Sequence, residues 1–249
     1  MNNITISLII TLIAGLSTCI GIIPTYINDR YKDKIINFSL AFSSGVMITI
    51  SFSSLIPEAL HYLNNLNIVN ILLVLIFINI GIILSIYIDK RLDKRISNNT
   101  LFKVGIVGII AILLHNVFEG ITTFITSYNE LKIGIYIAIA IALHNIPEGI
   151  SIAIPIYYST RNRKLTFIYT FIAGFSEFIG GILSYIFLSR FINSFIMSII
   201  LSITAGIMIQ ISTYELLPTS LRYKDNIITY IGLFLGFIIM FITIFIFKI

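Results

Sequence analysis

The chain alternates between long apolar stretches and short polar connections. An α-helix needs about 20 predominantly apolar residues to cross the hydrocarbon core of a bilayer. By that measure the pattern predicts eight membrane-spanning helices, at about residues 4–27, 36–60, 67–88, 101–127, 133–157, 165–189, 193–217 and 227–247. The longest polar connection, residues 89–100, is too short for a soluble domain, so we expect a single transmembrane domain over residues 1–249.

The composition leads to the same class of protein. Hydrophobic residues make up 57% of the chain and charged residues only 11%, whereas about 25% of the residues in a soluble domain are charged. We therefore expect an all-α integral membrane protein that is surrounded by lipid. The net charge of +5 does not point to nucleic acid, because the basic residues of membrane proteins gather in cytoplasmic loops.

The distribution of basic residues predicts the orientation. If both termini lie outside the cell, all but three of the 16 Lys and Arg residues fall at the inner side. The inner residues are Arg30, Lys32, Lys34, Lys90, Arg91, Lys94, Arg95, Lys103, Arg161, Arg163, Lys164, Arg222 and Lys224. The outer residues are Lys132, Arg190 and Lys248. By the positive-inside rule we expect a multi-pass protein of the cell membrane with both termini outside.

Three pairs of segments repeat within the chain. TLIAGLSTCIG (11–21) matches TFIAGFSEFIG (170–180), and SGVMITISFSSLIP (44–57) matches AGIMIQISTYELLP (205–218), in both cases without gaps. LLHNVFEGIT (113–122) matches ALHNIPEGIS (142–151). Each pair joins an odd-numbered helix to an even-numbered one, so its members run in opposite directions. This predicts inverted repeats in a 3+2+3 arrangement, which is common in secondary transporters; the third and eighth helices show no convincing match.

Ionisable and amide side chains interrupt the predicted spans near their middle. Such residues are expensive in lipid and indicate function by default. They are His115, Asn116, Glu119, His144, Asn145, Glu148 and Glu177. Residues four apart share a helix face, so each copy of the H-N-x-x-E-G pattern presents an imidazole and a carboxylate to one side. A helix–helix hydrogen bond would explain a lone His or Glu, but it explains two copies and a third carboxylate less well.

These residue types favour a divalent metal ion. Imidazole suits zinc and iron(II), and carboxylates add charge compensation. The predicted set contains no Cys, which fits a site that must release its ion, since structural zinc sites favour closed Cys-rich sets. Two alternatives remain open, a proton- or sodium-coupled antiporter and an intramembrane zinc hydrolase. The hydrolase is disfavoured because HExxH is absent and no nucleophile stands out, so we do not expect an enzyme.

The segments HNVFEGI (115–121) and HNIPEGI (144–150) resemble the signature helices of the ZIP (Zrt/Irt-like protein) family of metal transporters, in particular its bacterial GufA-like branch. SGVMITIS (44–51), FSEFIGG (175–181) and AGIMIQISTYELLP (205–218) resemble the second, sixth and seventh helices of that family. The resemblance implies eight helices with outer termini. It also implies import of zinc, often with iron, manganese, cobalt or cadmium, through a binuclear site.

Carried over by position, the resemblance implies two groups of ligands. Those of the first metal are Met47, His115, Glu119 and Glu148, with His144 adjoining them. Those of the second are Asn116, Asn145 and Glu177, with Glu119 and Glu148 as bridges. The sequence departs from the family in two places: Phe118 stands where many relatives have a kink-forming Pro, and the loop at 89–100 lacks the histidine cluster seen in some members.

Three further polar residues are candidates for the transport pathway. Glu58 and His61 are predicted near the outer end of the second helix, and Glu215 toward the inner end of the seventh. Glu215 aligns with Ser54 in the repeat, so the two ends of the path are predicted to differ. The sequence leaves open the preferred metal, proton coupling, the choice between carrier and channel, regulation, and whether the protein forms a homodimer.

Overall fold

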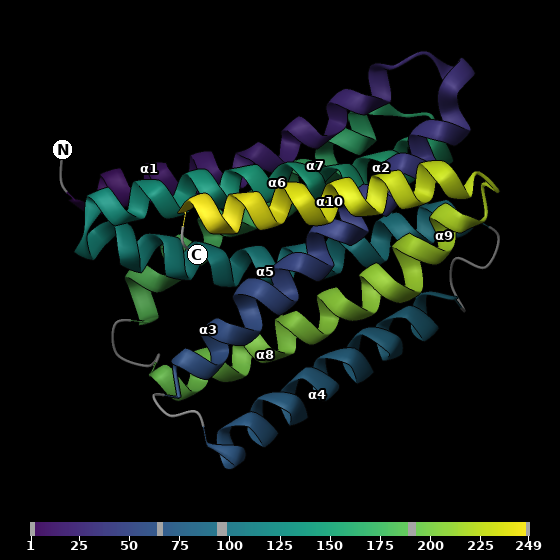
Figure 1. Cartoon of the computed structure of the whole chain (residues 1–249). Coiled ribbons are helices and arrows are strands. Elements are labelled where there is room, and N and C mark those ends of the chain that lie inside the picture. The colour runs from purple at the N-terminus through teal and green to yellow at the C-terminus, as the bar shows by residue number, and fades with distance from the viewer. Residues whose placement is uncertain (1–2, 64–66, 94–98, 189–192, 248–249) are drawn as a thin grey trace.

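In the computed structural model the described residues are 3–63, 67–93, 99–188 and 193–247, and their regular structure is entirely helical (Figure 1). The elements are α1 (Asn3–Leu16), η1 (Ser17–Tyr26), η2 (Asp29–Tyr31), α2 (Lys32–Ile50), η3 (Ser51–Leu55), α3 (Ile56–His61), α4 (Ile68–Asp93), α5 (Thr100–Asn129), α6 (Leu131–Thr160), α7 (Arg163–Leu183), η4 (Ser184–Leu188), α8 (Ser194–Gln210), η5 (Ile211–Leu216), α9 (Leu217–Leu221) and α10 (Asn226–Phe247).

These elements combine into eight helices that are long and apolar enough to cross a membrane, as the sequence predicts. The predicted limits agree with the structure to within a few residues, except that the second span begins earlier and the seventh ends later. The predicted end of the sixth span at residue 189 lies outside the described residues, as do Lys94, Arg95, Arg190 and Lys248. The ends marked N and C lie at the same end of the bundle (Figure 1).

The spans form two packed groups. In one group α5 packs against α6 and α7, and α1 with η1 packs against α6 and α7. In the other group α2 packs against α10, and α4 packs against α8. The two groups meet where α2 contacts α6 and where α5 contacts α8. α4 and α10 are the least buried spans, because only 22% of the residues in the most apolar stretch of each are buried. Their exposed apolar side chains suit a lipid environment.

The repeats predicted from sequence are visible in the packing. Gly15 on α1 and Gly174 on α7 face each other, and a Cβ built on either glycine would lie 2.3 Å from the carbonyl oxygen of the other. These glycines occupy equivalent positions in the matched segments 11–21 and 170–180. The two repeats therefore meet backbone to backbone, and a side chain at either position would separate them.

The structure also relates the third and eighth helices, for which the sequence shows no match. A Cβ on Gly45 of α2 would lie 2.3 Å from the carbonyl oxygen of Leu233 on α10. A Cβ on Gly206 of α8, the repeat equivalent of Gly45, would lie 2.1 Å from the carbonyl oxygen of Ile78 on α4. α4 and α10 thus pack on their neighbours through equivalent close approaches, and the inverted repeat extends over all six outer spans.

Local backbone geometry departs from a regular α-helix at equivalent places. The π-helical segments η3 and η5 come directly before the Pro-containing segments α3 and α9. A proline removes one backbone donor, and its ring collides with the carbonyl one turn earlier; a wider turn relieves that collision. The first span also tightens to 3₁₀ geometry in η1, which contains Pro24, whereas α5 and α6 continue as α-helices past Phe118 and Pro147.

Candidate metal centre

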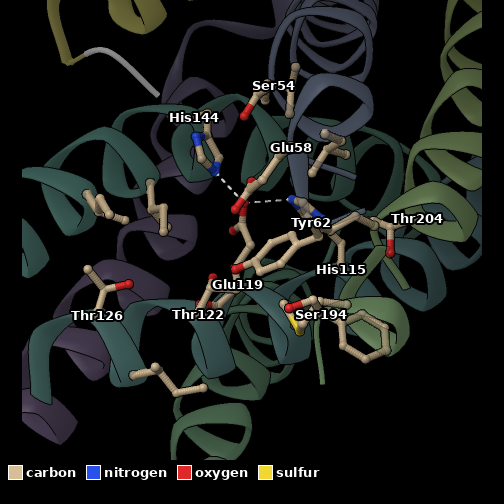
Figure 2. Close-up of a pocket in the computed structure, with 18 of the residues that line it drawn as sticks. Ser54, Glu58, Tyr62, His115, Glu119, Thr122, Thr126, His144, Ser194 and Thr204 are labelled. Carbon is tan, nitrogen blue, oxygen red and sulfur yellow. Dashed lines mark hydrogen bonds and ion pairs between the residues drawn. The ribbon is translucent and has the colours of Figure 1, made fainter. Parts of the chain in front are cut away.

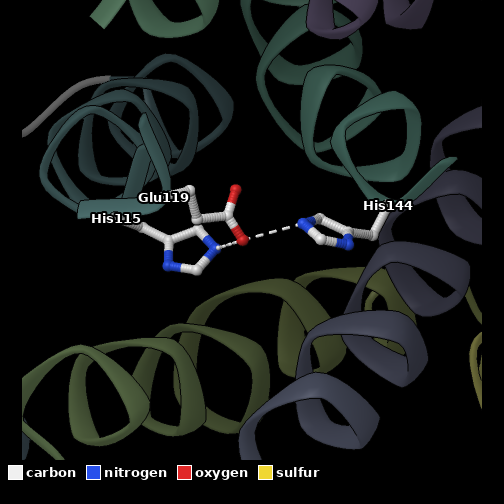
Figure 3. Close-up of side chains that lie close together, drawn as sticks. All are labelled: His115, Glu119 and His144. Atoms are coloured by element: carbon white, nitrogen blue, oxygen red, sulfur yellow. Dashed lines mark hydrogen bonds and ion pairs between the residues drawn. The ribbon is translucent and has the colours of Figure 1, made fainter. Parts of the chain in front are cut away.

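The centre of the molecule holds the two copies of the H-N-x-x-E-G pattern on the antiparallel helices α5 and α6. The Nε2 atom of His144 lies 2.8 Å from Oε1 of Glu119, and the Nε2 atom of His115 lies 2.9 Å from the same oxygen (Figure 3). One ligand atom from each of these three residues lies within 4.8 Å of the other two. One carboxylate oxygen is thus shared by two imidazoles that come from different helices.

Glu148 lies on the other side of His115. Its Oε1 atom is 3.5 Å from Nε2 of His115. The Glu148 side chain has no exposed surface, and neither of its oxygens has a hydrogen-bond partner among the described residues. Because an isolated buried carboxylate is strongly disfavoured, this side chain requires either a proton or a cation close to it.

The two asparagines of the pattern are anchored by the outer repeats. Asn116 donates a hydrogen bond from Nδ2 to the carbonyl oxygen of Ala173 at 3.0 Å, and Asn145 donates one to the carbonyl oxygen of Ala14, also at 3.0 Å. Ala14 and Ala173 are equivalent in the matched segments. Asn145 donates a second hydrogen bond to Oε2 of Glu177 at 2.9 Å, so the third carboxylate predicted from sequence joins the centre.

Several acceptor atoms around this centre have no hydrogen-bond partner in the described part of the chain. Besides the Glu148 oxygens, they are Oδ1 of Asn116, Oδ1 of Asn145, Oε2 of Glu119 and Oε1 of Glu177. Buried polar atoms normally have partners. A group of unpaired oxygen acceptors beside two imidazoles has the chemistry of a site for a hard or borderline divalent cation.

A cavity of about 290 Å³ adjoins the centre, and Figure 2 shows residues that line it. Its inner wall includes His115, Glu119 and His144, and its outer wall includes Thr126 near the end of α5 and Ser194 at the start of α8. We call the end at which these outer residues lie the mouth end and the opposite end the far end. The centre can therefore be approached from one side of the membrane.

Comparison with known proteins identifies the family to which this arrangement belongs. Residues 94–244 match the family model described as ZIP zinc transporter. The chain belongs to the ZIP family. Similar proteins include the zinc transporter ZupT of Clostridium perfringens, which is 34% identical with 99% of this chain and 98% of the relative covered. The zinc transporter ZupT of Lysinibacillus sphaericus is 33% identical with 96% of each chain covered, and that of Chlorobium chlorochromatii is 32% identical with 99% of each covered.

Membership of the ZIP family bears directly on the alternatives that the sequence left open. A family of transporters fits neither a hydrolase nor any other enzyme. The matches cover almost the whole chain, so the similarity includes both outer repeats as well as the central pair.

Met47, the remaining candidate ligand of this ZIP chain, lies on α2. Its side chain is fully buried and belongs to the apolar core that α2 shares with α8 and α10. It comes one helical turn after Ser43, whose hydroxyl bonds to the carbonyl of Pro147 on α6. The role of Met47 as a ligand stays a prediction.

The pathway candidates of the second span lie at the mouth end. Glu58 lines the central cavity together with Tyr62, and both side chains are drawn in its wall in Figure 2. Burial raises the pKa of the Tyr62 hydroxyl above its ordinary value, and the neighbouring Glu58 carboxylate raises it further. Glu58 also lines an adjoining hollow, which His61 and Tyr136 share. Glu58 thus lies where the hollow and the central cavity adjoin.

Glu215 lies at the far end; that this end is the inner one stays a prediction. Its Oε1 atom is 3.8 Å from Nζ of Lys103, and the same nitrogen lies 2.6 Å from Oδ1 of Asp89. The three side chains are between 11% and 16% exposed. Sequence reasoning did not single out Lys103 and Asp89, because each reads as an ordinary charge near a helix end.

Proposed function

We propose that this chain transports divalent metal cations across the cell membrane, with zinc as its principal substrate. The observation that carries the proposal is the Glu119 carboxylate, which two imidazoles share, beside a fully buried Glu148 whose oxygens have no partner. The printed function of the similar proteins, zinc transport, agrees with this chemistry. We propose further that residues 1–249 act as one transport domain.

The centre has enough ligands for two cations. We propose that the first cation binds to His115, Glu119 and Glu148, with His144 and Met47 beside it. We propose that the second binds to Asn116, Asn145 and Glu177, with Glu119 and Glu148 as bridges. The unpaired oxygens of the two asparagines and of Glu177 support the second group. Iron, manganese, cobalt and cadmium are further substrates to test against zinc, since carboxylate and imidazole ligands accept several of these ions.

The path runs from the mouth end to the far end. We propose that the far end faces the cytoplasm and that both termini lie outside, so that transport is uptake; the gathering of basic residues at the far end supports this through the positive-inside rule. Glu58 and His61 then attract the cation at the mouth, and Glu215 lies on the route of release. Acid is expected to slow uptake, because metal ligands must be deprotonated to bind.

A direct test measures the uptake of radioactive zinc into vesicles that contain the purified protein. The Glu148→Ala variant removes a carboxylate that the proposal makes indispensable to both cations, so zinc uptake should fall to background. Glu130→Gln removes an exposed carboxylate between α5 and α6 and should leave uptake unchanged. Zinc uptake by the Glu148→Ala protein at the wild-type rate would refute the assignment.

A second measurement separates this function from an antiporter that uses the same glutamates. Zinc, iron(II), manganese, cobalt and cadmium are supplied one at a time to the vesicles without a pH gradient. The proposal expects zinc uptake under these conditions. Proton flux that depends on sodium and does not respond to zinc would favour the antiporter instead.

A further inference from the structure

Beside the centre, a buried hydrogen bond connects the two packed groups of helices. The hydroxyl of Ser43 on α2 donates to the carbonyl oxygen of Pro147 on α6 at 2.7 Å. Ser43 and Pro147 are both buried, and the Ser43 side chain has no exposed surface. Pro147 directly precedes Glu148, so this bond attaches α2 to the helix turn that carries a carboxylate of the centre.

The inverted repeat assigns a counterpart to each member of this bond. Ser43 directly precedes the matched segment 44–57, and Thr204 directly precedes its match 205–218. Phe118 occupies the place of Pro147 in the other copy of the H-N-x-x-E-G pattern. The counterpart bond would therefore run from the hydroxyl of Thr204 on α8 to the carbonyl oxygen of Phe118 on α5. α8 and α5 belong to different packed groups, as α2 and α6 do.

The counterpart bond is not formed in this structure. Thr204 and Phe118 both line the central cavity, where Thr204 is drawn and labelled (Figure 2). Within the described part of the chain the Thr204 hydroxyl takes part in no hydrogen bond. Thr49 in the second span, by contrast, donates to the carbonyl oxygen of Gly45, whereas the buried hydroxyls of Thr18 and Thr123 have no partner among the described residues either. Thr204, which is buried, thus has an unused donor and lies in the wall of the cavity.

The leucines that precede Thr204 and Ser43 by one helical turn also differ in their surroundings. Leu201, one turn before Thr204, lines the cavity. Its repeat equivalent, Leu40, comes one turn before Ser43 and has no exposed surface. The packing around Leu40 is therefore complete, whereas Leu201, although buried, borders the cavity that leads to the mouth end.

We propose that Ser43 and Thr204 are the two halves of an alternating latch that decides which end of the path is open. In the present state Ser43 holds Pro147 and the far end is closed. When the mouth closes, the Thr204 hydroxyl donates to the Phe118 carbonyl, and Ser43 releases Pro147. The inference deepens the proposed transport function, because it names the contacts that exchange between its two states.

The expected shift between the two states follows from the free energy that one buried hydrogen bond contributes. Loss of one such bond shifts the ratio of two states by roughly 2- to 10-fold. Ser43→Ala should shift the protein toward the state with the far end open. Thr204→Val, which keeps the shape of the side chain without its hydroxyl, should shift it toward the state with the mouth open. The two variants must act in opposite directions.

Accessibility of introduced cysteines to a membrane-impermeant thiol reagent measures this shift in vesicles. The only native cysteine is first removed as Cys19→Ser, and Leu201→Cys or Leu40→Cys then reports on the mouth end or the far end. Ser43→Ala should lower the labelling rate at position 201 and raise it at position 40, by roughly 2- to 10-fold. Thr204→Val should change both rates in the reverse sense.

Two controls keep the test specific. Ser51→Ala removes a buried hydroxyl that donates only within its own span, to the Met47 carbonyl oxygen, and should leave both labelling rates unchanged. Ser43→Thr keeps the hydroxyl and should restore the wild-type rates. Shifts of Ser43→Ala and Thr204→Val in the same direction, or a shift in Ser51→Ala as large as in Ser43→Ala, would overturn the latch. Labelling does not depend on zinc, so a failure of zinc uptake in the wild-type protein counts against the proposed function alone.

Discussion

Glu119 and His144 lie 25 residues apart in the chain, on antiparallel helices, and 2.8 Å apart in space. The contact brings a carboxylate of one H-N-x-x-E-G copy against the imidazole of the other. Because His115 lies 2.9 Å from the same oxygen, neither copy forms the centre alone. The two helices must therefore keep their relative register for the centre to exist.

Loss of the His144 imidazole should weaken zinc binding without abolishing transport. His144→Gln removes a group that holds the Glu119 carboxylate, and removal of such supporting groups typically lowers metal affinity 10- to 100-fold. The KM for zinc uptake should rise by about that factor. His61→Gln, at the mouth end of α3, is the matched control and should raise the KM much less. A wild-type KM for His144→Gln would contradict the role given to this residue.

Gly120 should tolerate no larger residue, in contrast to Gly108 on the same helix. A Cβ on Gly120 would lie 1.8 Å from the carbonyl oxygen of Glu177, whereas a Cβ on Gly108 would lie 3.9 Å from its nearest neighbour. Gly120→Ala should lower the free energy of unfolding by about 1–3 kcal/mol, and Gly108→Ala should not lower it. Thermal unfolding in detergent measures the difference. Equal melting temperatures for the two variants would show that α5 and α7 can move apart at no cost.

The two central asparagines should contribute unequally to stability. Asn145 donates to both Ala14 and Glu177, whereas Asn116 donates to Ala173 alone. Each buried acceptor left without a partner costs about 1–3 kcal/mol. Asn145→Leu should therefore lower the melting temperature more than Asn116→Leu. The reverse order would mean that the Glu177 carboxylate finds another donor when Asn145 is lost.

The Lys103–Asp89 ion pair at the far end should stabilise the fold more than the exposed Arg161–Asp29 pair. Lys103 and Asp89 are 13% and 16% exposed, whereas Arg161 and Asp29, which lie 2.7 Å apart, are 44% and 60% exposed. Solvent screening leaves an exposed pair with about 0–1 kcal/mol.

Double-mutant cycles of thermal stability, with Lys103→Met and Asp89→Asn in one cycle and Arg161→Met and Asp29→Asn in the other, compare the coupling energies. The first coupling energy should be the larger of the two. Equal values would mean that water reaches the far end freely.

The sequence predicts the parts of this protein in which unusual residues recur. Histidines and glutamates in apolar surroundings are conspicuous, so the central pair and its inverted orientation are predictable from His115, Glu119, His144 and Glu148. The packing role of glycines is also predictable, because small residues permit close approach of helices. In the structure Gly149 allows such a close approach, since a Cβ at this position would lie 1.9 Å from the Thr18 carbonyl oxygen.

Other features depend on contacts that the sequence does not display. α4 and α10 are related by the close approaches of Ile78 and Leu233, but both helices consist of ordinary apolar residues, so no match appears between them. Lys103 meets Asp89 only because α4 and α5 come together at the far end. In the sequence Ser43 looks like any other serine in a helix, and only the structure shows that its hydroxyl bonds to Pro147.

The anchored amides of Asn116 and Asn145 have a consequence for the speed of exchange. A backbone carbonyl only accepts hydrogen bonds, so Ala173 and Ala14 fix which end of each amide faces away from them. The oxygens are thereby oriented before any ion arrives, and no side-chain rotation delays capture. The rearrangement of whole helices should then limit the rate of turnover. A stiffer bilayer should therefore slow turnover more than the replacement of one transported ion by another.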